Sequence, residues 1–374
     1  MKTFDDIAIR RPALAQSYLS LLQAEPGRPL ALFAPRRVGK TFFLDHDLAP
    51  EAESVGLLPV YADLWLNQSA PLDAINHALE EKLDELSVPH SRAGQIGQTP
   101  VKKVGALGFS LDLGEAPALR DLPEAPALRL DTLIHRLSRV FNGQILLLLD
   151  EVQTLAEAAD GAALIASLRA VLHKQRKRVC AVFTGSSQEA LALLVNTAGG
   201  PMYQFAQIIN FPFLGDEYLA KLIAHFRKVH PGKDIELEAL RAVFQKMGFK
   251  PALMRDLIKT MSAEGITDPS LGLRYFMRSE AHVAIWSALL NATSPYERGV
   301  LELIARGMPI FSREAIQYLS AIPGQKPTLQ KTRTAVDRLR KQGILTKSGA
   351  SASIEDHLFA EYLLESKAQK GGSL

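Results

Sequence analysis

The stretch of sequence that decides the fold is Ala34-Pro35-Arg36-Arg37-Val38-Gly39-Lys40-Thr41. It follows a short apolar run at residues 29–34 and precedes the apolar residues 42–44, a pattern that predicts a strand, a turn and then a helix. The stretch matches G-x-x-x-x-G-K-[ST] at every fixed position except the first, where Ala34 replaces glycine. Backbone N–H groups of such a loop point at phosphate oxygens. The stretch therefore predicts a phosphate-binding loop (P-loop).

Each fixed residue of this loop has a chemical role. Gly39 lets the backbone approach the ligand, Lys40 reaches the β- and γ-phosphates, and Thr41 supplies a hydroxyl to Mg²⁺. Ala34 costs little if its φ angle stays negative, whereas a left-handed conformation there would be strained. We expect ATP with Mg²⁺, and GTP as the less favoured alternative. The expected nucleotide contacts are Ala34, Pro35, Arg36, Arg37, Val38, Gly39, Lys40, Thr41 and Phe42.

A pair of carboxylates ends an apolar run far downstream of this loop. Leu146–Leu149 is followed by Asp150 and Glu151, which is typical of a Walker B element. In such an element the first carboxylate holds Mg²⁺ through water, and the second orients or deprotonates the attacking water. We expect Thr41 and Asp150 to be the metal ligands, and Glu151 and Lys40 to be catalytic. The alternative, an ordinary strand that ends at an acidic turn, is disfavoured by the loop upstream.

The apolar runs predict an α/β fold. Five of them read as strands, at residues 29–34, 57–64, 145–150, 178–184 and 207–211. Because helical stretches separate them, we expect a parallel sheet with helices on both faces. Thr184 ends the fourth strand, where a polar side chain would adjoin the γ-phosphate, so it is a candidate sensor and a third catalytic candidate. The alternative for this step is a helix N-cap at Ser186 or Ser187.

Changes of pattern along the chain predict its domain boundaries. Residues 101–114 alternate apolar with small or polar side chains and predict one arm of a hairpin, within an insertion at about residues 97–130. Beyond Pro212 the pattern becomes helical, and from about Ser294 it reads as three helices and a short β-ribbon. We therefore expect boundaries near residues 212 and 290.

Composition excludes several classes of protein. Of the 374 residues, 47% are hydrophobic and 22% charged, which is ordinary for a globular protein and argues against extensive disorder. The longest apolar runs fall far short of the roughly 20 residues of a membrane span, so we expect a cytoplasmic protein. One cysteine excludes an internal disulfide. The net charge of +3 gives no global basic field, so nucleic-acid binding would need a local patch.

These motifs together resemble a known family. They are Pro35–Thr41, Leu146–Glu151, Thr184–Ser187, Gly248–Leu253 and Ile354–Leu363. In this order the chain resembles the archaeal-type AAA+-like P-loop ATPases, which are similar to origin-recognition ATPases and to STAND signalling NTPases. The resemblance implies a P-loop core at residues 1–212, a helical lid at 213–290, a C-terminal winged helix at 291–374, and ATP as the nucleotide.

The resemblance also implies nucleotide contacts outside the loop. Gly248 and Pro251 match a family step, Gly-x-x-Pro, that contacts the base or ribose at the start of a lid helix. Arg10 lies in Ile9–Pro12, which resembles the family's opening arginine motif beside the adenine. Pro251 stands where an origin-recognition ATPase has a γ-phosphate-sensing arginine, and Arg255 is either its substitute or a solvated helix residue.

One departure from the family concerns hydrolysis. AAA+ assemblies usually supply an arginine finger between the sensor strand and the fifth strand, but residues 185–206 contain neither Arg nor Lys. A finger supplied in trans is worth about 10³-fold or more in rate. We therefore expect a slow hydrolase, or one that needs a partner's arginine.

Residues 328–341 predict a basic helix near the C-terminus. Val336 and Leu339 form its buried stripe, and the basic residues lie outside that stripe. Such a helix could lie in a DNA major groove. The alternative is a winged helix used for packing or autoinhibition, with its charges solvated. The candidate nucleic-acid contacts are Lys331, Arg333, Arg338 and Arg340.

The leading functional hypothesis is an ATP-dependent switch with weak Mg²⁺-dependent ATPase activity, which controls a DNA- or partner-bound assembly. One alternative is a DNA-binding replication or transposition regulator that uses the basic helix. The other is a STAND-like defence or signalling NTPase. The expected partners are ATP or ADP, possible duplex DNA, and a protein partner or further copies of the chain.

Overall fold

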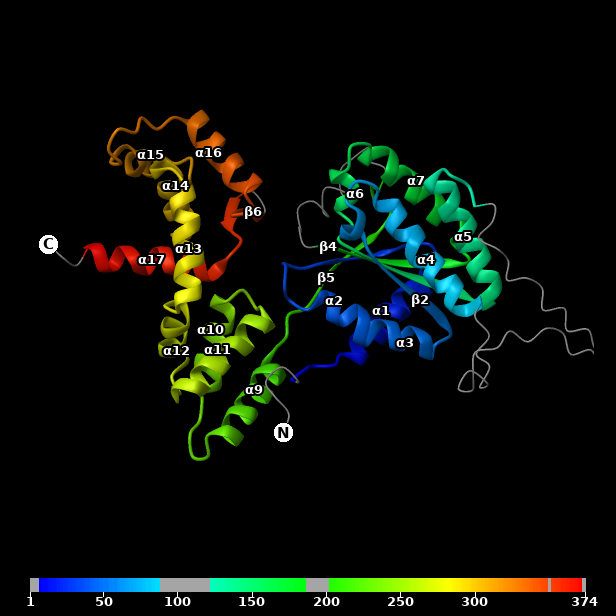
Figure 1. The fold of residues 1–374 in the computed structure, drawn as a ribbon, viewed down its shortest axis with the longest axis horizontal. Helices are drawn as coiled ribbons and strands as arrows, with labels where there is room; N and C mark the ends of the chain where they lie inside the picture. Colours follow the sequence, from blue (N-terminus) through cyan, green and yellow to red (C-terminus); the bar gives the residue numbers. More distant parts are fainter. Residues whose placement is uncertain (1–6, 88–121, 186–201, 349–350, 372–374) are drawn as a thin grey trace, which may run out of the picture. The chain divides into compact units, whose positions relative to one another are not determined.

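The computed structural model describes residues 7–87, 122–185, 202–348 and 351–371. The chain forms two compact units, which Figure 1 shows. The core unit comprises Arg10–Ala34 and Lys40–Phe211, and the C-terminal unit comprises Met1–Ile9, Pro35–Gly39 and Pro212–Leu374. The hairpin expected at residues 101–114 lies outside the described residues.

A five-stranded parallel sheet forms the centre of the core unit, which confirms the predicted fold class. Its strand order is β2-β3-β4-β1-β5. Each strand lies within a residue or two of its predicted bounds: β1 Leu30–Phe33, β2 Leu57–Asp63, β3 Gln144–Asp150, β4 Val179–Gly185 and β5 Gln207–Asn210. Sequence patterns could find the strands, but not the order in which they pair.

Side chains alternate between the two faces of this sheet. One face carries Ile145, Leu147 and Leu149 of β3, which pack in one apolar cluster with residues of α4 and α5. The intervening residues of β3 end with Asp150, which therefore lies on the opposite face. The same alternation places Tyr61 of β2 and Thr184 of β4 on the face of Asp150, because their neighbours Val60 and Phe183 belong to the first cluster.

Helices cover both faces of the sheet, as predicted (Figure 1). On the first face lie α4 Pro71–Ser87, α5 Pro126–Phe141, α6 Thr154–Glu157 and α7 Gly161–Lys174. On the face of Asp150 lie α1 Pro12–Ala24, α2 Lys40–Phe43, the π-helical turn η2 Leu44–Leu48, and α3 Ala49–Ser54. The short 3₁₀ turn η3, Leu64–Asn67, follows β2, and Asp63 caps it by accepting from the backbone of Trp65 at 2.9 Å. The segment α2–η2–α3 thus leads directly from the P-loop across the sheet.

The C-terminal unit is helical, with one small hairpin. Its helices are α9 Asp216–Val229, α10 Leu237–Lys246, α11 Pro251–Glu264, α12 Pro269–Met277, α13 Glu280–Ala292, α14 Pro295–Ala305, α15 Arg313–Ser320, α16 Leu329–Lys341 and α17 His357–Gly371. The strands β6, Leu345–Ser348, and β7, Ser351–Ile354, pair antiparallel between α16 and α17. The predicted succession of three helices and a β-ribbon corresponds to α14, α15, α16 and this hairpin.

Apolar packing is continuous through the C-terminal unit. One cluster of buried side chains extends from Tyr218 in α9 to Leu363 in α17. The boundary expected near residue 290 falls within α13, whose Trp286 is buried in this cluster. The division of this unit into a lid and a winged helix remains a prediction. No helix in the described ranges is both long and apolar enough to cross a membrane.

Candidate nucleotide site

The loop between β1 and α2 has the backbone that a P-loop requires. Gly39 has a φ angle of +97°, and a side chain there would meet no atom within 4 Å, so backbone conformation and not space demands glycine. Arg37 has a left-handed φ of +65°. Ala34 is not among the residues with positive φ, so alanine is accommodated without backbone strain at the first position of the motif.

Lys40 is held at the first residue of α2. Its side chain is 7% exposed, and Nζ donates a hydrogen bond of 2.7 Å to the main-chain oxygen of Ala34. Both residues belong to the core unit. The ammonium group therefore lies against the start of the loop, in the region from which a P-loop lysine reaches phosphate.

Asp150 is the centre of a buried hydrogen-bond network at the carboxyl end of β3. The residue is 5% exposed. Its Oδ2 accepts from Thr41 Oγ1 at 2.8 Å and from Tyr61 OH at 3.2 Å. Its Oδ1 accepts from the backbone N–H of Glu151 at 3.0 Å and from Thr184 Oγ1. The bond to Thr41 joins two motifs that are 109 residues apart in sequence, so the structure brings the expected P-loop and Walker B residues together.

Glu151 begins the turn after β3 in a conformation that side chains rarely adopt. Its φ angle is +55°. Gln153 Nε2 donates to its Oε2. An uncommon left-handed conformation at a non-glycine residue costs free energy and is concentrated at functional sites. Glu151 and Asp150 are neighbours in sequence, but the hydrogen bond from the Thr41 hydroxyl goes to the carboxylate of Asp150.

Thr184 is the buried partner of Asp150. It is fully buried, and its hydroxyl donates to the carboxylate from the neighbouring strand β4. The main-chain oxygen of Thr184 accepts from the N–H of Val152 at 3.0 Å, which fixes the turn after β3. This hydrogen bond holds the carboxylate of Asp150 in place, and the predicted role of Thr184 as a catalytic sensor remains a prediction. Ser186 and Ser187, the alternative N-caps, lie outside the described residues.

Tyr61 is a member of the site that sequence reasoning missed. It lies on β2, is 40% exposed, and donates its hydroxyl to Asp150. Burial of the phenol and the nearby carboxylate of Asp150 raise the pKa of Tyr61 well above its ordinary value, so the hydroxyl keeps its proton and acts as a donor. The signal that could have found it is its position two residues before Asp63, on the same face of a strand.

The oxygen atoms around Asp150 fit a magnesium ion. Mg²⁺ prefers hard oxygen ligands and is held by one or two carboxylates together with substrate phosphates. The hydroxyl of Thr41 and the carboxylate of Asp150, 2.8 Å apart, offer such oxygens next to the P-loop lysine. The described residues contain no cluster of three His, Cys, Asp or Glu side chains that could hold a metal by itself. Phosphate oxygens would complete the coordination.

The N-terminal arginines brace the segment that follows the P-loop. Arg10 Nε donates to Asp47 Oδ1 at 2.7 Å, and its Nη2 donates to the main-chain oxygen of His46. The guanidinium of Arg11 lies 5.2 Å from the ring centroid of Phe43 and 4.3 Å from that of Phe211. Burial lowers the pKa of Arg11. The side chain of Arg10 is thus hydrogen-bonded to two residues of η2, and its expected contact with adenine remains a prediction.

Phe42 has a stacking partner of its own. It is half-buried, and its ring stacks on that of His46 with centroids 4.2 Å apart and an angle of 8° between planes. The imidazole lies one helical turn further along the chain. The contact between Phe42 and nucleotide that the sequence predicts remains a prediction.

Two of the motifs that carry the family resemblance, Gly248–Leu253 and Ile354–Leu363, are in contact within the C-terminal unit. Lys250 is 5% exposed, and its Nζ donates to the main-chain oxygen of Glu355 at 3.0 Å. Pro251 begins α11, and its main-chain oxygen accepts from Tyr218 OH at 2.7 Å. Arg255, further along α11, is half-buried rather than fully solvated. The structure therefore links the Gly-x-x-Pro step to the turn before α17, and the predicted nucleotide contact of Pro251 is untested.

Several basic side chains of helix α16 interact with other residues of the C-terminal unit. Lys331 Nζ donates to Gln325 Oε1 at 2.8 Å and lies 4.6 Å from the ring centroid of Tyr296. Arg338 Nε lies 3.5 Å from Oε1 of the buried Glu297. Arg340 is half-buried and lies 3.6 Å from Asp337 Oδ1, whereas Arg333 is exposed. The four candidate nucleic-acid contacts therefore differ in how available they are.

Comparison with known proteins supports the fold. No family model and no curated protein sequence matches the chain. Among solved structures, it is similar to the Walker-type ATPase of Pyrococcus abyssi, with a TM-score of 0.58 and 16% identity over 95% of this chain and 96% of that one. It is also similar to the ADP form of the Aeropyrum pernix ORC2 protein, with a TM-score of 0.52 and 16% identity over 96% and 92% of the two chains.

These likenesses extend over nearly the full length of this chain and of each of the two proteins. At 16% identity they establish fold. The chain has the fold of the archaeal AAA+ P-loop ATPases, as its motifs predicted.

Proposed function

We propose that this chain is an ATP-binding switch of the AAA+ type, whose weak Mg²⁺-dependent ATPase activity controls a partner- or DNA-bound assembly. The observation that carries the proposal is the hydrogen bond of 2.8 Å between Thr41 and Asp150. It joins the end of the P-loop to the acidic end of β3, next to the buried Lys40. A hydroxyl, a carboxylate and an ammonium gathered at the start of a helix are the groups that a Mg²⁺-bound triphosphate needs.

The relatives support the choice of an adenine nucleotide. The Aeropyrum pernix ORC2 protein was solved in an ADP form and in complexes with ADPNP and ADP. The P-loop pattern itself requires only phosphate groups, so the base is an inference from these relatives and from the family resemblance. A competition of ATP against GTP for the purified chain would decide it directly.

The hydrolytic step follows from the positions of the chain's own residues. Mg²⁺, when bound with ATP, would neutralise charge on the β- and γ-phosphates. Asp150 and Thr41 would hold it, with Thr184 and Tyr61 fixing the carboxylate by their hydrogen bonds. Glu151 would orient the attacking water and accept its proton. The ammonium group of Lys40 would stabilise the negative charge on the β- and γ-phosphates.

The expected rate is low. The sequence from residue 185 to residue 206 contains no arginine or lysine, so a second copy has no cation there to place on the γ-phosphate. We expect turnover below about 1 s⁻¹, the lower end of the usual range for phosphoryl transfer. The rate per subunit should not rise with protein concentration. Cooperative, concentration-dependent turnover would contradict this and would locate a cation elsewhere in the chain.

Calorimetric titration tests the proposal most directly. The full chain should bind ATP in Mg²⁺, and chelation of Mg²⁺ should weaken that binding. Radiolabelled phosphate release then measures turnover over a wide range of protein concentrations. The absence of ATP binding by a folded chain would overturn the proposal.

The second candidate function, DNA binding through α16, is favoured by the exposure of Arg333 and Lys341. Arg338, by contrast, lies beside Glu297 and has less charge to offer. If α16 contacts DNA, the double variant Arg333→Ala/Lys341→Ala should weaken duplex binding and flatten its salt dependence. The control Arg227→Ala removes an exposed arginine of α9, which pairs with Asp234 in the loop that follows this helix. Salt-independent or absent binding would favour a protein partner.

A further inference from the structure

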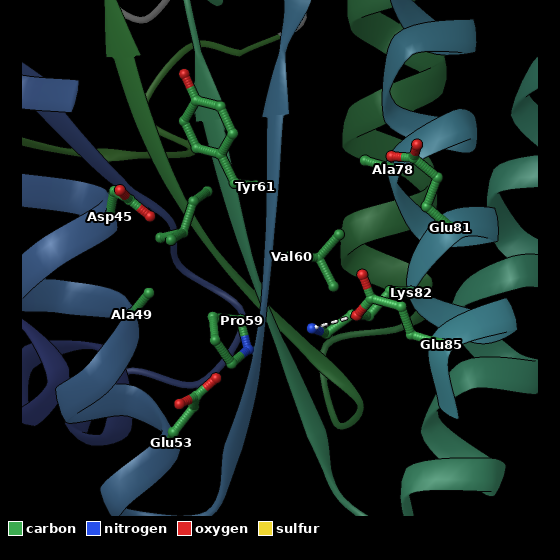
Figure 2. Close-up of a pocket in the computed structure, with 11 residues that line it drawn as sticks. Asp45, Ala49, Glu53, Pro59, Val60, Tyr61, Ala78, Glu81, Lys82 and Glu85 are labelled. Carbon is green, nitrogen blue, oxygen red and sulfur yellow. Dashed lines mark hydrogen bonds and ion pairs between the residues drawn. The ribbon is translucent and has the colours of Figure 1, made fainter. Parts of the chain in front are cut away.

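A groove of about 260 Å³ lies along β2, the strand at one end of the sheet as the described residues form it. Figure 2 shows β2 running along its floor, with Pro59, Val60 and Tyr61. One wall comes from η2 and α3 on one face of the sheet, and the other wall comes from α4 on the opposite face. The edge strand β2 therefore lies between two layers of helices, which form the walls of the groove.

The floor of the groove has backbone groups to offer. In the part of the chain that the structure describes, β2 pairs with β3 alone. An edge strand presents a row of N–H and C=O groups that can pair with another strand. Proline is tolerated in a strand when its nitrogen faces the open side, because it has no N–H to donate. With Pro59 in that position, the backbone groups of Leu57 and Tyr61 face the same side, since the direction of these groups alternates along a strand.

The walls of the groove are acidic. Asp45 and Glu53 stand on one side of β2, and Glu81 and Glu85 stand on the other (Figure 2). Among the described residues that line the groove there is one lysine, Lys82, and it is paired with Glu85 at 2.9 Å. Four carboxylates against one ammonium leave the groove negative. Charge complementarity therefore selects an occupant with basic side chains.

Two of these carboxylates, Asp45 and Glu81, each lie close to a histidine. His46 Nδ1 lies 3.0 Å from Asp45 Oδ2, and His77 Nε2 lies 3.4 Å from Glu81 Oε1. Both pairs are largely exposed to solvent. Neither pair involves Glu53 or Glu85, so the negative character of the groove does not depend on them.

Tyr61 connects this groove to the nucleotide site. Its side chain lines the groove, and its hydroxyl donates to Asp150 Oδ2. A backbone that pairs with β2 at this position would restrict the same residue that positions the expected Mg²⁺ ligand. The connection runs through a single side chain and a single hydrogen bond.

We propose that the groove binds a basic, extended segment of a partner protein as an added strand on β2, and that Tyr61 couples this binding to Asp150. The coupling rests on the proposed ATPase function, whereas the binding does not. Main-chain hydrogen bonds supply affinity in such strand addition, and alternate side chains supply specificity. The acidic walls determine the sign of the charge on the occupant, and the edge strand on the floor offers backbone groups that pair with an extended chain.

A synthetic peptide of alternating lysine and valine tests the binding. Fluorescence anisotropy with the full chain, without nucleotide, should detect this peptide, while a peptide of alternating glutamate and valine should not bind. Methylation of the backbone nitrogens along one edge of the lysine peptide should abolish binding, and methylation along the other edge should spare it. Equal binding of both methylated peptides would overturn strand addition in favour of simple charge attraction.

Variants of the walls locate the site. Glu53→Gln/Glu81→Gln/Glu85→Gln should weaken binding of the lysine peptide at least tenfold, a change of about 1.4 kcal/mol. The matched control Glu25→Gln/Glu124→Gln/Glu157→Gln changes three exposed carboxylates of the core unit outside the groove and should bind as the unaltered chain does. Equal losses in both triple variants would overturn the assignment.

The coupling has its own readout. The lysine peptide should change the rate of ATP turnover by the unaltered chain, and this response should disappear in Tyr61→Phe, which keeps the ring but removes the hydroxyl. Peptide binding with no response in the unaltered chain would overturn the coupling alone. A chain that binds the peptide but not ATP would leave the groove assigned and would refute the proposed function instead.

Discussion

The two units each contain a buried lysine that donates to a main-chain oxygen, and the pair differs in what surrounds it. Lys40 in the core unit bonds to Ala34 at 2.7 Å, and Lys250 in the C-terminal unit bonds to Glu355 at 3.0 Å. Their exposures are 7% and 5%. Lys40 stands beside a loop whose backbone suits phosphate. Lys250 instead joins two segments of its own unit that are 105 residues apart.

The contacts around Lys250 connect the start of α11 to the turn before α17, and we call this connection the joint. Gly248 has a φ of +69°, and a Cβ built there would lie 2.8 Å from Cδ2 of His357, so both conformation and space require glycine. On the other side of the joint, Asp356 accepts from Trp286 Nε1 at 3.0 Å. A buried lysine is therefore no sign of function by itself. What distinguishes Lys40 is an adjacent network that ends in Asp150.

The largest expected effect separates the carboxylate proposed to be catalytic, Glu151, from a structural one, Asp356. Glu151→Gln should abolish ATP turnover while ATP stays bound, because the role proposed for the carboxylate is to act on water in the transition state. Asp356→Asn, the matched change in the joint, should leave turnover intact and lower the melting temperature. Single-turnover hydrolysis and calorimetric binding measure both variants. If Glu151→Gln hydrolyses ATP at the unaltered rate, another residue orients the water.

The second prediction compares the two lysines directly. Lys40→Ala should lower ATP affinity at least tenfold, or about 1.4 kcal/mol, because it removes the cation that we propose binds the phosphates. Lys250→Met should leave ATP affinity within about twofold, a difference of only a few tenths of a kcal/mol. Calorimetry on folded protein measures both. Unchanged affinity in Lys40→Ala would remove the distinction between the two lysines.

The third prediction concerns stability. Lys250→Met leaves the main-chain oxygen of Glu355 without its donor, which should cost about 1–3 kcal/mol of unfolding free energy. Denaturant titration measures this loss. A variant as stable as the unaltered chain would show that the joint does not depend on this hydrogen bond.

The same residue gives a pH dependence with a defined sign. Burial lowers the pKa of Lys250 from its ordinary value of 10.5, so the unfolded chain holds this proton more tightly than the folded chain does. Stability from this group is therefore lost as pH falls through the window below 10.5 and is gained as pH rises through it. The difference in unfolding free energy between Lys250→Met and the unaltered chain should change across that window. A constant difference would contradict the shift.

The smallest effect tests two tyrosine hydroxyls. Tyr61→Phe should lower kcat by about 2- to 10-fold, the equivalent of one neutral hydrogen bond, with little change in KM. Tyr218→Phe removes a hydroxyl that donates to Pro251 in the C-terminal unit at 2.7 Å and should leave kcat unchanged. Steady-state kinetics on both variants measures the contrast. Equal effects on kcat would assign Tyr61 a merely structural role.

The sequence predicted most of the site because its motifs are local. Residues 34–41 contain their own strand, turn and helix signals, and the apolar run before Asp150 identifies a buried strand without knowledge of its neighbours. Thr184 could be placed near the nucleotide since polar groups at the carboxyl ends of parallel strands share one edge. Its bond to Asp150, in contrast, depends on β3 and β4 being neighbours.

What the sequence determined by itself is the phosphate loop, the acidic end of β3, the five strands and the helical character of the C-terminal half, because each follows from residue type and spacing within a short stretch. Tertiary structure alone decided the strand order. Among the described strands, that order places β2 at an edge of the sheet, sets the hydroxyl of Tyr61 3.2 Å from Asp150 Oδ2 and opens the acidic groove beside it. It also brought Lys250 to Glu355. These contacts join residues far apart in the chain, and no local pattern specifies which distant segment becomes a neighbour.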